Sequence, residues 1–172
     1  MNQGYASPAR ALSARPVTLA WLVAVGVDLF FNAGLFSGLF DQAREPGLLG
    51  DDSLFRRIPV AYLGLLVGVI ALAWVVDRSG RRDAVSGAVI GSGFGVIAAL
   101  LGIVSLWTAI EMTGAFVAAG AFVQVVEFAA AGAVLGAWRG DAGRRRVTRS
   151  AILAALLAAI AGIVIQNLMG GG

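Results

Sequence analysis

The chain has 172 residues, of which 59% are hydrophobic and 13% are charged, and its mean hydropathy is +0.86. Soluble domains carry about 25% charged and about 45–50% apolar residues. This composition excludes a disordered chain and an ordinary soluble globule. It indicates a multipass membrane protein, which we expect in a bacterial plasma membrane.

Several kinds of chemistry are excluded by residue types that the sequence lacks. It contains no Cys and no His, and all 13 basic residues are Arg. Disulfides, thiolate or imidazole metal sites and a lysine Schiff base are therefore excluded. We expect no cofactor and no metal ion. We also expect no nucleic acid partner, because the arginines cluster at the ends of apolar segments, where they orient helices in a bilayer.

Five apolar segments are long enough to cross a bilayer, which takes about 20 residues per helix. In chain order these segments are residues 17–40, 59–76, 84–110, 114–138 and 150–169. They predict an all-α bundle of five transmembrane helices, forming one domain over residues 17–169 between tails at 1–16 and 170–172. The first segment is much longer than the 7–15 or so apolar residues of a signal peptide, so we expect it to remain as a helix.

The distribution of arginines predicts a cytoplasmic N-terminus and an external C-terminus. In that orientation ten arginines lie in cytoplasmic segments and three lie outside, as the positive-inside rule requires. Aromatic residues are expected at the two interfaces. Trp21, Trp74 and Trp138 would lie near the inner interface, with Trp107 and Tyr62 near the outer one.

Small residues recur at four-residue spacing in every segment. Membrane helices associate through close backbone approach, which such spacing permits. The longest stripe is Gly87, Gly91 and Gly95 in the third segment, and it predicts packing inside a compact bundle. A homodimer through the same helix is the alternative. The other small-residue sets are Gly34 and Gly38, Gly64 and Gly68, Gly132 and Gly136, and Ala151, Ala155 and Ala159.

Two carboxyl groups are predicted near the bilayer midplane. Asp28 lies at the centre of the first segment and Glu127 at the centre of the fourth. A charge at this depth costs on the order of 2.5–3.5 kcal/mol. Asn32 and Gln124 are polar neighbours on the same helix faces. We therefore expect these four side chains to form one cluster in which the two acids share a proton. The alternative is a structural role, in which hydrogen bonds within the cluster hold two helices together.

Three acidic residues outside the spans are also candidates. Glu111, in the turn between the third and fourth segments, would be either a solvated residue or an external entrance to the buried pair. Asp51 and Asp52 favour a cap on a short interfacial helix over a cation site.

Three functions are compatible with this pattern. The first is a small carrier or channel in which Asp28 and Glu127 bind a proton or cation. The second is an accessory subunit of a larger membrane complex. The third is an intramembrane isomerase or cyclase that uses the two carboxyls, without metal, as acid and base on an apolar substrate. The expected partners are the lipid bilayer, an unidentified substrate, and a further copy or another chain. The surroundings of the two acids would discriminate between these functions.

Overall fold

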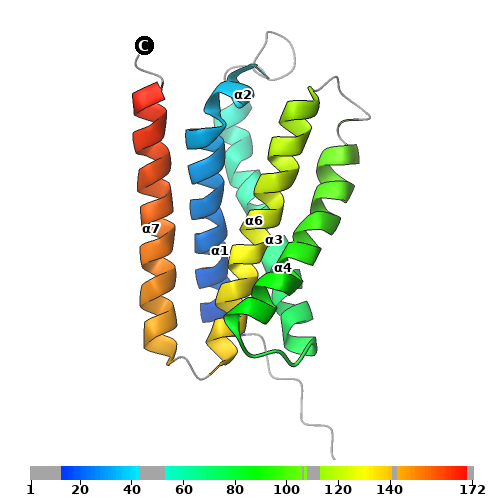
Figure 1. Cartoon of the computed structure of the whole chain (residues 1–172), viewed down its shortest axis with the longest axis vertical. Helices are drawn as coiled ribbons and strands as arrows, with labels where there is room; N and C mark the ends of the chain where they lie inside the picture. The colour runs from blue at the N-terminus through cyan, green and yellow to red at the C-terminus, as the bar shows by residue number, and fades with distance from the viewer. Residues whose placement is uncertain (1–12, 43–52, 106, 108–112, 141–142, 170–172) are drawn as a thin grey trace, which may run out of the picture.

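The computed structural model describes residues 13–42, 53–105, 107, 113–140 and 143–169, without the side chains of 40–42, 53–57, 104 and 169. Within these residues the chain forms helices joined by turns, and five helices are long and apolar enough to cross a membrane (Figure 1). The predicted all-α multipass bundle is confirmed.

Each predicted span corresponds to one long helical segment. In chain order the elements are α1 (Ala14–Asp28), η1 (Leu29–Leu35), α2 (Ser37–Gln42), α3 (Ser53–Arg78), α4 (Ala84–Ala99), η2 (Leu100–Val104), α6 (Gly114–Arg139) and α7 (Arg144–Met169). Successive long helices run in opposite directions, so α1 begins and α7 ends at opposite ends of the bundle (Figure 1). We call the end where α1, α4 and α7 begin the arginine end.

Every arginine whose side chain is described lies near the arginine end. α1 and α7 begin there, and α3 and α6 end there. These residues are Arg15, Arg78, Arg81, Arg82, Arg139, Arg144, Arg145, Arg146 and Arg149.

Several helix ends differ from the sequence expectation. α3 begins at Ser53, so Pro59 lies inside the helix rather than in its first turn. Only one backbone hydrogen bond near the start of the helix is lost by this placement. α7 begins at Arg144 rather than at Ser150, because arginine is a good helix former and a helix can continue beyond the apolar span. The first predicted helix is divided, since α1, η1 and α2 all fall within or beside it.

Side chains cap the starts of α4 and α6. The Asp83 carboxylate accepts a hydrogen bond of 2.7 Å from the backbone N–H of Ser86 at the start of α4. This bond holds the pKa of Asp83 below its ordinary value. Thr113 similarly accepts a hydrogen bond from the backbone of Phe116 at the start of α6. Both caps satisfy amide donors that have no partner within the helix.

The glycine stripe of α4 packs directly against the backbone of α6. A Cβ atom at Gly87 would overlap the carbonyl oxygen of Gly132, and one at Gly91 would overlap that of Phe128. At Gly95 it would lie 2.7 Å from the Cα of Val125. The predicted packing inside the bundle is therefore confirmed for this stripe, which has no free face for a homodimer contact.

α7 packs against α1 and η1 by the same principle. A Cβ at Gly26 would lie 2.7 Å from the carbonyl oxygen of Ala155, and one at Gly34 would lie 2.9 Å from the Cα of Gly162. The small-residue set of α3 behaves differently. Gly64 has open space around it, and Gly68 instead accommodates the ring of Phe128. The expectation of close backbone approach is wrong for α3, because a side chain from α6 fills the space.

The main apolar core lies between α1, α3 and α6, on the arginine side of Asp28 and Glu127. Its centre is tightly packed, since Val69, Leu72 and Val76 of α3 are fully buried. The buried members are Val17, Ala20, Ala24, Val69, Leu72, Ala73, Val76, Phe128, Ala131 and Leu135. This layer separates the midplane carboxyls from the arginine end of the bundle.

Candidate functional site

Asp28 accepts hydrogen bonds from two different elements. Its Oδ1 atom accepts a bond of 2.5 Å from Nδ2 of Asn32, which lies one turn later on η1. Its Oδ2 atom accepts a bond of 2.9 Å from the hydroxyl of Tyr62 on α3. Both oxygens of the carboxyl group therefore have a donor, which offsets part of the cost of removing this acid from water.

Glu127 completes the carboxyl pair from α6. It is 6% exposed and is the only charged residue that is buried among the described side chains. Its carboxyl group interacts electrostatically with that of Asp28, and the two acids line the same cavity. Two ionised carboxylates in one cavity repel each other, and a proton shared between them relieves that repulsion.

Gln124 lies one turn from Glu127 and lines the same cavity as Asp28 and Asn32. The four side chains that the sequence singles out are therefore brought together, with Gln124 on the cavity wall.

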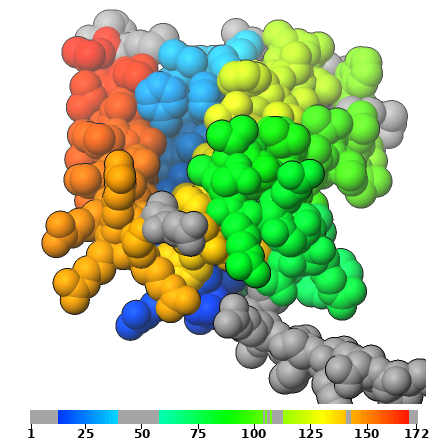
Figure 2. Space-filling model, turned by 60° about the horizontal axis from the view of Figure 1, so that its bottom comes forward, coloured from blue at the N-terminus to red at the C-terminus, as the bar shows by residue number. Residues whose placement is uncertain are grey.

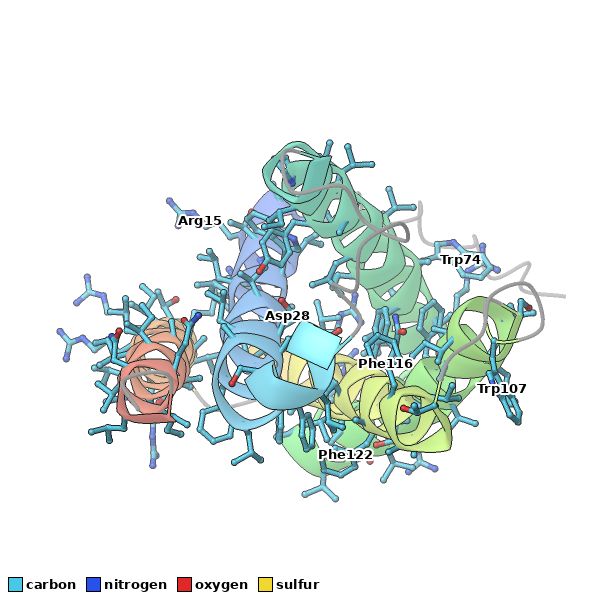
Figure 3. The ribbon with its side chains drawn as sticks, turned by 90° about the horizontal axis from the view of Figure 1, so that it is seen from above. Arg15, Asp28, Trp74, Trp107, Phe116 and Phe122 are labelled. Carbon is cyan, nitrogen blue, oxygen red and sulfur yellow. The ribbon has the colours of Figure 1, made fainter. Side chains whose placement is uncertain are left out.

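The cavity beside these residues has a volume of about 460 Å³. It lies between α1 with η1, α3, η2 and α6. Figure 3, viewed from the end opposite the arginine end, shows Asp28 and Phe116 on the sides of this space. The polar lining residues are Asp28, Asn32, Tyr62, Gln124 and Glu127, and the apolar ones include Ile58, Leu65, Ile103, Phe116 and Val123.

Both π-helical segments border this cavity. η1 begins immediately after Asp28 and carries Asn32, while η2 carries Ile103. π-helical turns are rare, and they occur frequently at functional sites because they shift the side chains that follow onto a new face. In the first helix this shift follows directly after the carboxylate.

One polar atom of the cluster remains without a partner. The Oδ1 atom of Asn32 is buried and accepts no hydrogen bond from the described residues. A buried carbonyl oxygen without a donor is costly. The Oδ1 atom of Asn32 can therefore accept one more hydrogen bond, for example from a water molecule, which can itself belong to the hydration shell of a cation.

Tyr62 is the site residue that the sequence interpretation missed. We expected it near the outer interface and Trp21 near the inner one, but Nε1 of Trp21 donates a 3.0 Å hydrogen bond to the carbonyl oxygen of Tyr62. The two residues therefore lie within reach of each other, so the expectation that they lie at opposite interfaces is wrong. The available signal was a tyrosine hydroxyl inside an apolar span, where such a group needs a hydrogen-bond partner.

The other interfacial aromatic residues follow the expectation more closely. Arg78 lies over the ring of Trp74 at 4.6 Å, and Arg144 lies 5.9 Å from the ring of Trp138. Both tryptophans are thus at the arginine end. Trp107 follows η2, at the other end of the bundle, and its half-exposed side chain lies on the outside of the bundle (Figure 3).

Some candidates cannot be related to this site. Glu111, Asp51 and Asp52 lie outside the described residues. Within the part of the chain that is described, no three acidic, His or Cys side chains gather as a metal site would require.

Comparison of the chain with protein-family models, with curated proteins and with solved structures finds no match.

Proposed function

We propose that this protein is a small proton- or cation-coupled carrier or channel in which Asp28 and Glu127 bind the transported charge. The observation that carries the proposal is the cavity that ends at these two carboxyls. The protein is a five-span helical membrane protein, and we infer that this cavity gives the buried acid pair access from one side of the bilayer.

The depth of the cavity supports this proposal. Its lining on α6 extends from Phe116, near the start of the helix, to Glu127. Eleven residues of α-helix correspond to roughly 16 Å along the axis. The hydrocarbon core of a bilayer is about 30 Å thick. The acid pair would therefore lie about halfway across the membrane, at the closed end of a one-sided entrance.

The opposite side of the pair is closed by packed side chains. Leu72, Phe128 and Ala131 belong to the buried core that separates the carboxyls from the arginine end. A second cavity beyond this core reaches Ala73 and Leu135. The eight residues from Glu127 to Leu135 correspond to roughly 12 Å of helix. We infer that transport requires this short apolar barrier to open while the other side closes.

The chemistry of the cluster suits reversible binding of a proton. Among the described residues, no arginine lines this cavity to neutralise the carboxyls permanently. One proton on the pair leaves a single negative charge, which the donors Asn32 and Tyr62 stabilise at Asp28. A second proton, or a cation bound near the free carbonyl oxygen of Asn32, would neutralise the site. Neutralisation lowers the cost of moving the site through the apolar barrier.

A flux measurement with purified protein tests the proposal. We expect liposomes containing the protein to dissipate an imposed gradient of protons, sodium or potassium, and Asp28→Asn or Glu127→Gln to lower that flux at least tenfold. Asp83→Asn is the matched control, because it removes an exposed carboxylate outside the span while keeping a capping acceptor. Absence of flux in the wild type, or equal flux in all variants, would refute the carrier.

The apolar walls of the cavity support a second candidate, an intramembrane acid–base enzyme. Ile58, Leu65 and Phe116 would contact an apolar substrate while Asp28 and Glu127 exchange protons with it. This candidate predicts a membrane-soluble ligand that copurifies with the protein and no ion flux. Copurification of a second protein chain without either property would instead favour an accessory subunit.

We further propose that the arginine end faces the cytoplasm of a bacterial cell. The positive-inside rule supports this orientation, since the described arginines gather at that end. The chain has no cysteine, so single cysteines can report the topology. A membrane-impermeant thiol reagent should label Gly114→Cys on intact cells, whereas Arg81→Cys should react only after lysis. The reverse labelling pattern would show that the arginine end faces the outside of the cell.

A further inference from the structure

A second cavity, of about 430 Å³, lies at the arginine end. α1, α3, α6 and α7 and the turn after α3 contribute to its lining. Figure 2 turns this end toward the viewer and shows the side chains of the first turns of α7, in orange, projecting from it. The charged residues that line the cavity are Asp77, Arg81, Arg82, Arg139 and Arg144. Among the described side chains, four cations and one carboxylate therefore line the cavity.

Arg139 contacts that carboxylate through only one of its two terminal nitrogens. Its Nη2 atom forms a 2.8 Å ion pair with Oδ1 of Asp77 and lies 3.4 Å from the carbonyl oxygen of Ala73. Its Nη1 atom is buried and has no hydrogen-bond partner among the described residues. A buried guanidinium donor without an acceptor is unfavourable, so this atom indicates an acceptor that the described residues do not supply.

We propose that this cavity binds a phosphate group, carried either by the headgroup of an anionic phospholipid or by a free phosphate. Guanidinium groups present several donors in a fixed plane, which suits the oxygens of phosphate. A phosphate oxygen would supply the missing acceptor at Nη1 of Arg139. Its charge would also relieve the mutual repulsion of Arg81, Arg82 and Arg144.

The location of the cavity fits both sources of phosphate. It lies where α1 and α7 begin and where α3 and α6 end, which is the level of the lipid headgroups for helices of this length. Basic pockets between transmembrane helices on the cytoplasmic side commonly bind anionic headgroups. The start of α7 adds the positive end of a helix dipole. Among the described residues, none lines both this cavity and the cavity beside Asp28 and Glu127, so the inference goes beyond the proposed transport function.

Thermal stability in a neutral detergent tests the proposal without measuring transport. Purified protein is titrated with phosphatidylglycerol, with phosphatidylcholine at the same lipid ratio, and with inorganic phosphate against chloride at equal ionic strength. We expect the anionic phospholipid or inorganic phosphate to raise the melting temperature by several degrees, while phosphatidylcholine and chloride do not.

Two pairs of variants distinguish the cavity from the general positive charge of this end. The double variant Arg81→Gln, Arg82→Gln should bind the stabilising ligand, phospholipid or phosphate, with at least tenfold lower affinity. The control, Arg145→Gln with Arg149→Gln, removes the same charge from residues of α7 that do not line this cavity, and it should change the affinity less than twofold. Arg139→Lys can keep the pair with Asp77 but loses the second guanidinium nitrogen, and should also weaken binding at least tenfold. Arg78→Lys is its control, because Arg78 lies over Trp74 instead.

The two ligand arms identify the source of the phosphate. Stabilisation by both ligands supports recognition of the phosphate group itself, and stabilisation by the lipid alone supports a headgroup site. Stabilisation by inorganic phosphate alone supports a site for a free phosphate. The proposal is overturned if neither ligand acts on the wild type, or if the control variants weaken binding as much as the cavity variants do.

Discussion

Replacing Gly91 by alanine should separate α4 from α6. The added Cβ would overlap the carbonyl oxygen of Phe128 and would lie 2.8 Å from its carbonyl carbon and 3.1 Å from the Cα of Ala129. These are backbone atoms of a helix, so no side chain can rotate away. Since carbon atoms pack best at about 3.5–4.0 Å, the helices must move apart by roughly 1 Å.

The expected loss of stability is large for a single methyl group. Overpacking a tight interior costs about 1–3 kcal/mol, and the rigid backbone on both sides of Gly91 favours the upper end. A cost of about 3 kcal/mol corresponds to a fall of roughly 6–12 °C in melting temperature for a chain of this size. Gly91→Leu, with a bulkier side chain, should be more damaging still.

Gly93→Ala provides the matched control. Gly93 lies on the same helix but has nothing within 4 Å of a Cβ, so the alanine should leave the melting temperature unchanged or raise it slightly, as a better helix former does. The assay is thermal unfolding of both variants in the same detergent, followed by circular dichroism. Equal melting temperatures for Gly91→Ala and Gly93→Ala would refute the assigned contact between α4 and α6.

Two further predictions concern side-chain hydrogen bonds. Tyr62→Phe removes a hydrogen-bond donor to Asp28. Because a hydrogen bond to a charged group contributes about 1.5 kcal/mol or more, we expect the proton flux in liposomes to change about tenfold while the fold is kept. Unchanged flux would exclude Tyr62 from the site. Asp83→Ala should lower the melting temperature at pH 7, because the lowered pKa of Asp83 means that its ionised form stabilises the start of α4. That stabilisation is present above the ordinary value of 3.8 and is lost as the pH falls through the lower folded-state value. The difference between the variant and the wild type should therefore shrink toward pH 3, and a difference that grows on acidification would contradict the assignment.

The sequence by itself determined the features that depend on the bilayer as a solvent. Five long apolar runs specify five spans, because unpaired backbone groups are too costly in hydrocarbon for other structures. The centres of two runs place Asp28 and Glu127 at similar depth, and the cost of a charge there brings the two acids together. The small-residue stripe at Gly87, Gly91 and Gly95 indicates a close contact between helices, because only small residues allow helix backbones to touch in a membrane.

The tertiary structure decided which helix faces which. Lipid and protein interior are about equally apolar, so hydrophobicity does not distinguish the faces of a membrane helix. For this reason the sequence indicated that the Tyr62 hydroxyl needs a partner but not that the partner would be Asp28, and it did not indicate that Gly68 would receive the ring of Phe128. The π-helical segment η1, which follows Asp28 and packs against α7, was likewise not predicted from the sequence. The pairing of Asp77 with Arg139 likewise required the ends of α3 and α6 to meet, because only tertiary packing brings residues so distant in sequence within reach of one another.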